Sequence, residues 1–184
     1  MNKAQLRKSF VTKRLSLDQT EILKKSQKIS KLVLELPQVK NARKLAIYLP
    51  VKNEVETQRI IDELITNGNR VYLPKYFSPW KKYDFVKFSG WTNLEKGPFG
   101  ILQPKSVEVA SSLQIDVAII PGIAFDKNGV RLGYGKGVFD QLLSGLPAFK
   151  IGLAYDFQIA KKLPGEKHDL RMDIIVTEKG VTRS

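Results

Sequence analysis

The chain has no cysteine and only one histidine, His168, among its 184 residues. Without cysteine there is no disulfide, no thiolate zinc site and no cysteine nucleophile. A single histidine excludes a metal site built from several imidazoles. No apolar run approaches the roughly 20 residues that cross a bilayer, and the opening residues MNKAQLRKSF lack the apolar core of a signal peptide. We therefore expect a soluble, cytoplasmic protein.

Basic residues exceed acidic ones by a wide margin, with 31 Lys and Arg against 18 Asp and Glu, for a net charge of +13. Such a balance favours anionic partners, whether nucleic acid, nucleotides or polyanionic metabolites, and does not choose among them. A solvated basic surface without a partner explains the charge equally well. The length suits one domain spanning residues 1–184, and no repeat or low-complexity linker divides it.

Short apolar runs alternate with helical patterns along the chain. Helices are predicted over 3–11, from Ser16 or Asp18 to Pro37, between Thr57 and Gly68, and from Val138. Strands are predicted at 44–50, 70–76, 83–88, 116–122, 149–155 and 173–177. This alternation predicts an α/β fold: a single-domain, three-layer αβα open sheet, mostly parallel and Rossmann-like. Ligands of such sheets bind outside the carboxyl ends of the strands.

One glycine-rich stretch, NGVRLGYGKGVFDQLL at 128–143, has the composition of a phosphate loop. Its alternating Gly133, Gly135 and Gly137 do not fit G-x-G-x-x-G, and the residue after Lys136 is not the Ser or Thr of a Walker A motif. Glycines nevertheless let backbone N–H groups approach a phosphate, and a helix start and a lysine add positive charge. Asp140, one turn on, is a candidate Mg²⁺ ligand. A tight turn with a solvated lysine is the alternative.

Cations also gather at the amino terminus. On one continuous helix, Lys3, Arg7 and Arg14 fall within about 40° of one another, in the same arc as Phe10. We expect them to face the protein body, where buried cations need an anionic partner. The alternative is that the helix ends before Arg14 and the side chains reach water.

Acidic residues follow or precede two predicted strands. Glu54 and Glu56 come after the first strand, where a ligand contact is expected. Asp169 and Asp173 precede or open the last, where one of them is a candidate second metal ligand. A solvated loop acid is the default for Glu56, and a loop cap is the alternative for the aspartates.

Taken together, these motifs resemble the 5-formyltetrahydrofolate cyclo-ligase family, also called 5,10-methenyltetrahydrofolate synthetases. The resemblance spans nearly the whole chain in family order, through KAQLR, YLPVKNEVET, PGIAFDKNGVRLGYGKGVFD, GLAYDFQ, LPGEKHDLRMD and IIVT. Phe139 stands where a tyrosine is common in the family, and Val138 where an aromatic or small residue is. Neither departure removes a charge or a metal ligand.

The resemblance implies an enzyme that uses ATP and Mg²⁺ to cyclise 5-formyltetrahydrofolate to 5,10-methenyltetrahydrofolate, releasing ADP and phosphate. In the family's proposed mechanism the formyl oxygen attacks the γ-phosphate of ATP, and N10 then displaces the phosphate. The nucleophiles belong to the substrate, so one histidine is no obstacle. We expect a monomer that binds small molecules rather than nucleic acid or membrane. A non-enzymatic RNA-binding module is disfavoured because aromatics and cations do not interleave.

The same resemblance implies roles for individual residues. Lys136 and Arg131 would be catalytic, with Lys136 neutralising the transferring phosphoryl group. ATP would be bound by Lys3, Arg7, Arg131, Leu132, Gly133, Tyr134, Gly135, Lys136, Gly137 and Phe139. The folate would contact Leu49, Glu54, Phe99 and Tyr134, and the metal ligands would be Asp140 and Asp169. A basic surface near Lys75 would attract folate glutamate tails.

Overall fold

A seven-stranded sheet forms the centre of the computed structural model, which describes residues 2–110, 115–164 and 170–183. The strand order is β12 (Gly180–Arg183), β11 (Ile174–Thr177), β9 (Phe149–Leu153), β6 (Val117–Pro121), β1 (Lys44–Ala46), β2 (Arg70–Phe77) and β3 (Lys82–Lys87). The strands from β11 to β2 are parallel, and the two edge strands β12 and β3 are antiparallel. The predicted mostly parallel α/β sheet is therefore confirmed.

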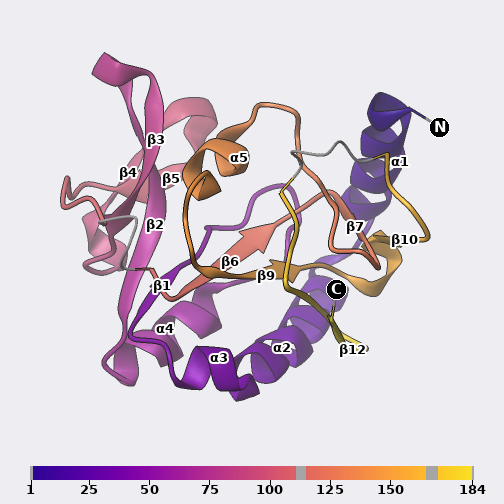
Figure 1. The fold of residues 1–184 in the computed structure, drawn as a ribbon, viewed down its shortest axis with the longest axis horizontal. Coiled ribbons are helices and arrows are strands. Elements are labelled where there is room, and N and C mark those ends of the chain that lie inside the picture. Colours follow the sequence, from indigo (N-terminus) through magenta and orange to yellow (C-terminus); the bar gives the residue numbers. More distant parts are fainter. Residues whose placement is uncertain (1, 111–114, 165–169, 184) are drawn as a thin grey trace.

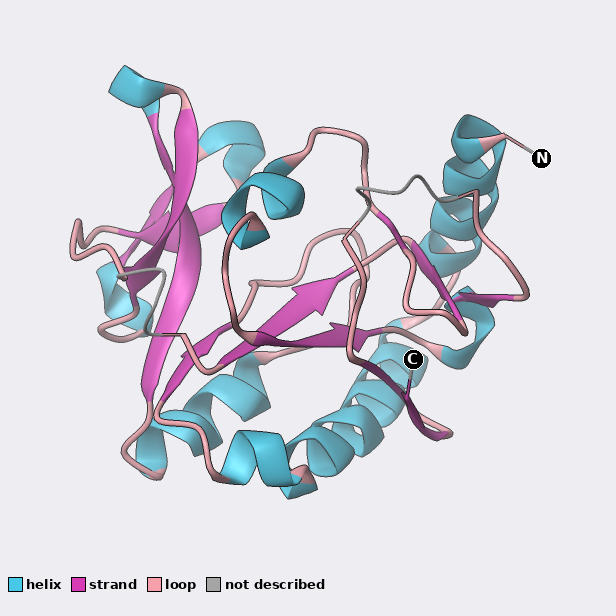
Figure 2. Ribbon diagram, viewed as in Figure 1, coloured by secondary structure: helices cyan, strands magenta, loops and turns pink. Residues whose placement is uncertain are grey.

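Helices cover both faces of this sheet (Figures 1 and 2). On one face lie α2 (Gln19–Glu35), α3 (Pro37–Lys40) and α4 (Gln58–Thr66). On the other lies the short α5 (Val138–Leu143). Side chains alternate across the sheet as the strand period of two requires: Leu45 and Ile47 belong to the cluster under α2 and α4, whereas Ala46 belongs to the cluster under α5.

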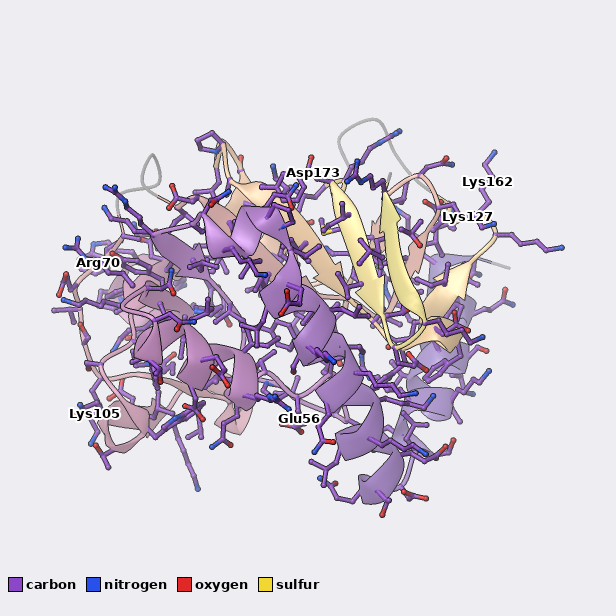
Figure 3. All side chains as sticks on the ribbon, turned by 90° about the horizontal axis from the view of Figure 1, so that it is seen from below. Glu56, Arg70, Lys105, Lys127, Lys162 and Asp173 are labelled. Carbon is purple, nitrogen blue, oxygen red and sulfur yellow. The ribbon has the colours of Figure 1, made fainter. Side chains whose placement is uncertain are left out.

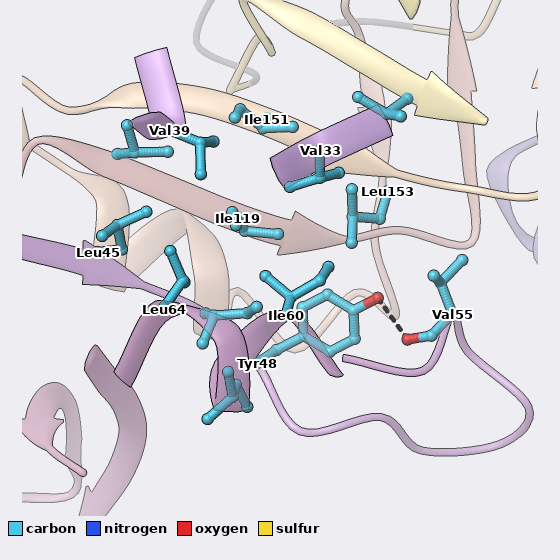
Figure 4. Packing of buried hydrophobic residues seen from close by; sticks show 14 of the residues in the cluster. Val33, Val39, Leu45, Tyr48, Val55, Ile60, Leu64, Ile119, Ile151 and Leu153 are labelled. Atoms are coloured by element: carbon cyan, nitrogen blue, oxygen red, sulfur yellow. Dashed lines mark hydrogen bonds between the residues drawn. The ribbon is translucent and has the colours of Figure 1, made fainter. Parts of the chain in front are cut away.

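Figure 4 shows the cluster beneath α2 and α4, in which β1, β6 and β9 contribute aliphatic side chains that are fully buried. Tyr48 also belongs to this cluster, and its hydroxyl donates a 2.9 Å hydrogen bond to the carbonyl of Val55. At about 25 cal/mol per Å² of apolar surface, burial of this layer is the main stabilising contribution to the sheet. The hydrogen bond from Tyr48 to Val55 also holds the loop that follows β1.

Two smaller sheets and the amino-terminal helix complete the fold. A three-stranded sheet contains β10 (Ile159–Ala160), β7 (Ala124–Asp126) and β8 (Arg131–Leu132). Helix α1 (Lys3–Leu15) packs Leu6, Phe10 and Val11 against it. A two-stranded sheet contains β4 (Leu94–Lys96) and β5 (Leu102–Pro104). Single 3₁₀ turns lie at η1 (Ser78–Trp80), η2 (Trp91–Asn93), η3 (Pro98–Gly100) and η5 (Asp156–Gln158).

Several element boundaries differ from those predicted. Helix α1 continues to Leu15, so the alternative in which it ends before Arg14 is wrong. Asp18, rather than Ser16, caps α2, because its side chain accepts the N–H of Glu21 at 2.8 Å. Thr57 occupies the N-cap position of α4, as predicted, but its hydroxyl donates to the carbonyl of Tyr48 instead of capping the helix. Across the described residues, no helix has both the length and the apolar character to span a bilayer.

Candidate functional site

The largest concentration of predicted site residues lines one cavity at the carboxyl edge of the sheet. Its walls come from β2, from the loops after β1 and β6, from the segment around η3 and β5, and from the glycine loop between β8 and α5. Between β1 and β6 the chain reverses its direction of travel across the sheet: β2 and β3 lie to one side, β9 and β11 to the other. Ligand sites of open α/β sheets form at such switch points.

The glycine loop forms one wall, and its backbone requires glycine at two positions. Gly135 has φ +83° and Gly137 has φ +65°, values that side-chain-bearing residues seldom adopt. Arg7 of α1 holds the loop from behind: its Nε donates a 2.8 Å hydrogen bond to the carbonyl of Gly133. A Cβ on Gly135 would lie 3.2 Å from the Arg7 guanidinium carbon. Helix and loop are therefore packed without room for a larger residue.

Arg131 lies against the same loop and carries an unsatisfied donor. Its guanidinium forms a 2.9 Å ion pair with Asp140, and it stacks 5.7 Å from the ring centroid of Phe139. Its Nε is buried and has no hydrogen-bond partner among the described residues. An unmet buried donor costs about 1–3 kcal/mol. Arg131 also lines the cavity, where the charge of its guanidinium favours an anion.

A buried charged network supports the cavity wall at Glu54 and Tyr134. Arg14 is 1% exposed, and it donates to the carbonyls of Lys52 at 2.9 Å and Gly122 at 3.1 Å and to the hydroxyl of Tyr134. The same guanidinium lies 3.6 Å from the carboxylate of Glu54. These contacts join α1 to three separate loops, and they provide the anionic partner that a buried cation needs.

Both carboxylate oxygens of Glu54 accept hydrogen bonds. The Tyr134 hydroxyl donates to Oε1 at 3.2 Å, and the N–H of Val51 donates to Oε2 at 3.1 Å. Burial raises the pKa of Glu54 to about 7, although the nearby Arg14 opposes the shift. Burial and the Glu54 charge raise the pKa of Tyr134 to about 12, so its hydroxyl remains a donor. The result is a carboxyl group that titrates near neutrality at the wall of a cavity.

Comparison with known proteins shows which family has this sequence and architecture. The 5-formyltetrahydrofolate cyclo-ligase family profile matches residues 1–178. The chain belongs to the 5-formyltetrahydrofolate cyclo-ligase family. The cyclo-ligase of Saccharomyces cerevisiae is 32% identical over 90% of this chain and 90% of its own length. That of Escherichia coli is 32% identical over 84% and 88%, and that of Mus musculus 29% identical over 89% and 87%.

Solved structures agree with this membership. The 5,10-methenyltetrahydrofolate synthetase of Aquifex aeolicus superposes with a TM-score of 0.90 at 35% identity, covering 100% of this chain and 93% of that one. The synthetase of Mycoplasma pneumoniae gives 0.78 at 29% identity, covering 97% and 99%. Both the family expected from the motifs and the predicted α/β fold are confirmed, and the chain is an enzyme of the cyclo-ligase family.

Most residues expected from the family pattern reach this cavity. They are Leu49, Glu54, Arg131, Gly133, Tyr134, Gly135, Lys136, Gly137, Phe139 and Asp140. Arg7 touches the glycine loop from behind, and Lys3 lies in the first turn of α1 without lining the cavity. Leu132 is buried against Ile123 and Leu163, which leaves only its backbone for a ligand.

Two expected residues are not tested by the structure. Asp169, the second expected metal ligand, lies outside the described residues. Phe99 lies in η3, between cavity-lining Pro98 and Ile101, but its side chain is outside the described part of the structure. Among the residues that are described, no three carboxylates or imidazoles gather as a metal cluster. Of the two predicted metal ligands, Asp140 is the one that the structure describes.

Three hypotheses are not supported. Asp173 lies at the amino end of β11, where its carboxylate accepts the N–H of Lys150 at 2.6 Å, so it is a cap far from the carboxyl edge (Figure 3). Glu56 does not line this cavity, and it is half-buried rather than the solvated loop acid of its default interpretation (Figure 3). Lys75 is 7% exposed, and its ammonium donates to Glu95 and to the carbonyls of Pro104 and Lys105. Because this ammonium is buried and already has three acceptors, it is not accessible to bind a glutamate tail.

Sequence reasoning did not assign a role to Arg14 or expect the apolar floor of the cavity. Apolar and aromatic lining comes from Tyr48, Leu73, Pro74 and Tyr83, which belong to strands and their ends, and only Tyr48 lies in a quoted motif. The available signal for Arg14 was its place on the same helical arc as Arg7, with an acid after the first strand as its partner. Only the fold brings residues 14, 54 and 134 together.

Proposed function

We propose that this chain cyclises 5-formyltetrahydrofolate to 5,10-methenyltetrahydrofolate and hydrolyses ATP, with Mg²⁺, to ADP and phosphate. The observation that carries the proposal is the cavity in which a cationic glycine loop faces a buried acid, in a chain whose family profile spans residues 1–178. Its relatives from yeast, mouse and Escherichia coli are named as cyclo-ligases for this substrate.

Phosphorylation gives the reaction its driving force. A formamide oxygen is a poor leaving group, and transfer of the γ-phosphoryl group onto it makes it a good one. N10 of the folate then attacks the activated carbon, and phosphate departs. Because both nucleophiles come from the substrate, the chain's task is to position the two substrates and to neutralise charge.

Residues of the glycine loop suit the phosphoryl half of that task. We propose that the backbone N–H groups of Gly133 to Gly137 and the Lys136 ammonium bind the phosphates. Arg131 adds a guanidinium whose buried Nε lacks an acceptor within the described residues. Helix α5 has only six residues, so we attribute the positive charge mainly to side chains rather than to its dipole. Lys3 and Arg7 complete the cationic side from α1.

The metal fits the same side of the cavity. Mg²⁺ is commonly held by one or two carboxylates together with phosphate oxygens and water. Asp140, 58% exposed at its side chain in the first turn of α5, meets that requirement, and we propose Asp169 as its companion. Bound there, the ion would neutralise phosphate charge.

The folate half of the cavity is apolar with one acid. We propose that Leu49, Leu73 and the segment around Phe99 contact the ring system and that Glu54 contacts the folate beside them. We also propose that the chain acts as a monomer on small molecules. The absence of cysteine fits the reducing cytoplasm, where disulfides contribute little.

An optical assay tests the proposal. Methenyltetrahydrofolate has a near-ultraviolet absorption band that 5-formyltetrahydrofolate lacks. Purified protein mixed with 5-formyltetrahydrofolate and Mg-ATP is expected to develop that band, and no band is expected when ATP is omitted or Mg²⁺ is chelated. Folded protein that produces no band with all components present would refute the proposed reaction.

A further inference from the structure

The proposed cyclisation requires a proton acceptor that the phosphoryl step does not. N10 carries a hydrogen in the 5-formyl substrate and none in the methenyl product. As N10 donates its electron pair to the phosphorylated formyl carbon, a C–N bond forms and the N10 proton must leave. The N5 electron pair then expels phosphate, whose oxygen keeps the electrons of the broken C–O bond. One base, and no oxidant or reductant, balances this step.

Two acids line the cavity in the described part of the chain, Glu54 and Asp140, and they differ in setting. Asp140 is 58% exposed at its side chain and is paired with Arg131 on the cationic side. Glu54 is 3% exposed and lines the same cavity as the apolar Leu49, Leu73 and Pro74. A proton acceptor shielded from water and next to the ring-binding surface matches Glu54 and not Asp140.

The carboxylate of Glu54 is also fixed in place. Val51 donates to one oxygen and Tyr134 to the other, while Arg14 lies 3.6 Å away. Lys52 and Asn53, directly before it, have φ of +52° and +58°. Two consecutive non-glycine residues in this region store strain of about 1–3 kcal/mol each, which persists only where neighbours impose it.

Arg14 is the neighbour that imposes this conformation. Its Nε donates to the carbonyl of Lys52, and the side-chain amide of Asn53 donates to the backbone carbonyls of Arg14 and Leu17 at 3.4 Å. Nη2 of the same guanidinium donates to the Tyr134 hydroxyl that in turn donates to Glu54. One buried residue thus orients both the loop and the carboxylate.

We propose that Glu54 is a catalytic residue that accepts the N10 proton as the ring closes, and that Arg14 and Tyr134 are the residues that position its carboxylate. This inference rests on the proposed function and adds to it an acid–base step. A carboxyl group with a pKa of about 7 holds a proton more strongly than an ordinary glutamate, yet about half of it is ionised at neutral pH and available to accept a proton.

The charged and titratable groups around Glu54 come from several elements. They are Arg14 of α1, Arg131 of β8, Tyr134 of the glycine loop, Tyr48 after β1, Tyr155 before η5, and Lys52 and Glu56 of its own loop. The tyrosines among them are neutral near pH 7, since the pKa values of Tyr48, Tyr134 and Tyr155 are all raised by burial. Burial also raises the pKa of Glu56, so the pH dependence of Glu54 is read against that of the Glu56→Gln variant.

Glu54→Gln tests the proposal, because it keeps the shape and removes the base. We expect methenyltetrahydrofolate formation at pH 7.5 to fall by roughly 100-fold or more. The phosphoryl step needs no base, so it should survive. It is followed as folate-dependent scrambling of an ¹⁸O label from the β–γ bridge of ATP into the other β oxygens. The matched control is Glu56→Gln, two residues away and outside the cavity, with the wild-type rate expected.

The outcomes separate the two proposals. Wild-type protein that forms no methenyl product refutes the proposed function itself. With active wild type, a Glu54→Gln rate within about threefold of normal overturns the proton role. Loss of both product and scrambling in folded Glu54→Gln also overturns it, since Glu54 would then act before ring closure.

A wild-type measurement keeps the test decisive if the variant does not fold. With Mg-ATP saturating, kcat/KM for the folate is expected to fall as the pH drops below about 7, approaching tenfold per unit, as Glu54 becomes protonated. A flat profile between about pH 5.5 and 8 overturns the assignment.

Discussion

At the scale of single residues, the cavity brings cations and a buried acid together. Lys136 and Arg131 line it, Arg7 binds the glycine loop, and Glu54 accepts a hydrogen bond from Tyr134 of that loop. Arg14 does not line the cavity, so its charge acts through Glu54 and Tyr134. Under the proposed function, the cations would bind the phosphates of ATP and the acid would contact the folate.

Lys136→Ala tests the cationic side. Loss of one preorganised charge aimed at a transferring phosphoryl group typically costs about 100- to 1,000-fold in kcat, and we expect a loss of that order in methenyl formation. Folate binding, followed by calorimetry without ATP, should be retained because Lys136 is on the phosphate side. Near-normal turnover would show that the lysine is not aimed at the phosphoryl group.

Lys127→Ala is the matched control. Lys127 is an exposed lysine in the turn between β7 and β8, outside the cavity lining (Figure 3). Its removal changes the net charge as Lys136→Ala does, so a comparable loss of activity in both variants would point to the overall charge rather than to the site.

Residues that follow a strand or belong to the glycine motif lie where the sequence predicted a site. Glu54 and Lys136 were expected for those reasons and Leu49 from the family resemblance, and all three line the cavity. The contact between Arg14 and Glu54 could not be predicted, because 40 positions separate the two and no local pattern records the pairing. Lys75 misled for the opposite reason: a cation in a strand was taken as exposed, whereas the β4–β5 sheet covers it.

At the scale of elements, the glycine loop and α1 work as a unit, since Arg7 binds the carbonyl of Gly133. Gly135→Ala should disturb that unit twice, through the positive φ of +83° and through a Cβ placed 3.2 Å from the Arg7 guanidinium. We expect a stability loss of about 1–2 kcal/mol and, in addition, a KM for ATP raised about tenfold or more. Urea denaturation and steady-state kinetics measure the two effects.

Gly68→Ala is the control for backbone strain alone. Gly68 has φ +81°, close to that of Gly135, but it follows α4, and a Cβ added to it would meet no described atom within 4 Å. The same urea titration should show a similar loss of stability without a change in KM for ATP. Equal kinetic effects in both variants would contradict a specific role of the glycine loop.

Element prediction from sequence worked for periodic segments and failed for short ones. The parallel strands β2, β6, β9 and β11 and the helices α2 and α4 were predicted because their apolar patterns extend over several residues. Strands β7, β8 and β10 contain two or three residues each, too few to show a period, so the sheet that supports α1 was not predicted. The extent of α1 was underestimated because Arg14 is a charged residue at a buried position.

At the scale of the whole molecule, the sheet order determines which loops meet. Placing β1 between β6 and β2 brings the loop of Glu54, the end of β6 and the apolar floor of β2 to one edge. The sequence predicted an open sheet and a site at its carboxyl edge, but it could not predict this strand order. Non-local pairing depends on packing that no single segment records.

Burial of Glu54 gives global stability a defined pH dependence. Its pKa is about 7 when folded and near 4.5 when unfolded, so between these values the folded chain holds a proton that the unfolded chain releases. The contribution of Glu54 to the free energy of unfolding therefore falls as the pH rises from about 4.5 to about 7, and it does not change further above pH 7. Relative to Glu54→Gln, wild-type protein should lose about 3 kcal/mol over that range. Urea titrations of both proteins check this, and parallel pH curves would contradict it.

The stoichiometry of the reaction tests the central claim most directly. The claim is that the folate and the γ-phosphate of ATP react together in one cavity, so each methenyl group formed must release one phosphate. Near-ultraviolet absorbance and phosphate release, followed in the same sample with limiting 5-formyltetrahydrofolate, should rise in equal amounts and stop together. Phosphate release without the absorption band, or the band without phosphate release, would contradict the account.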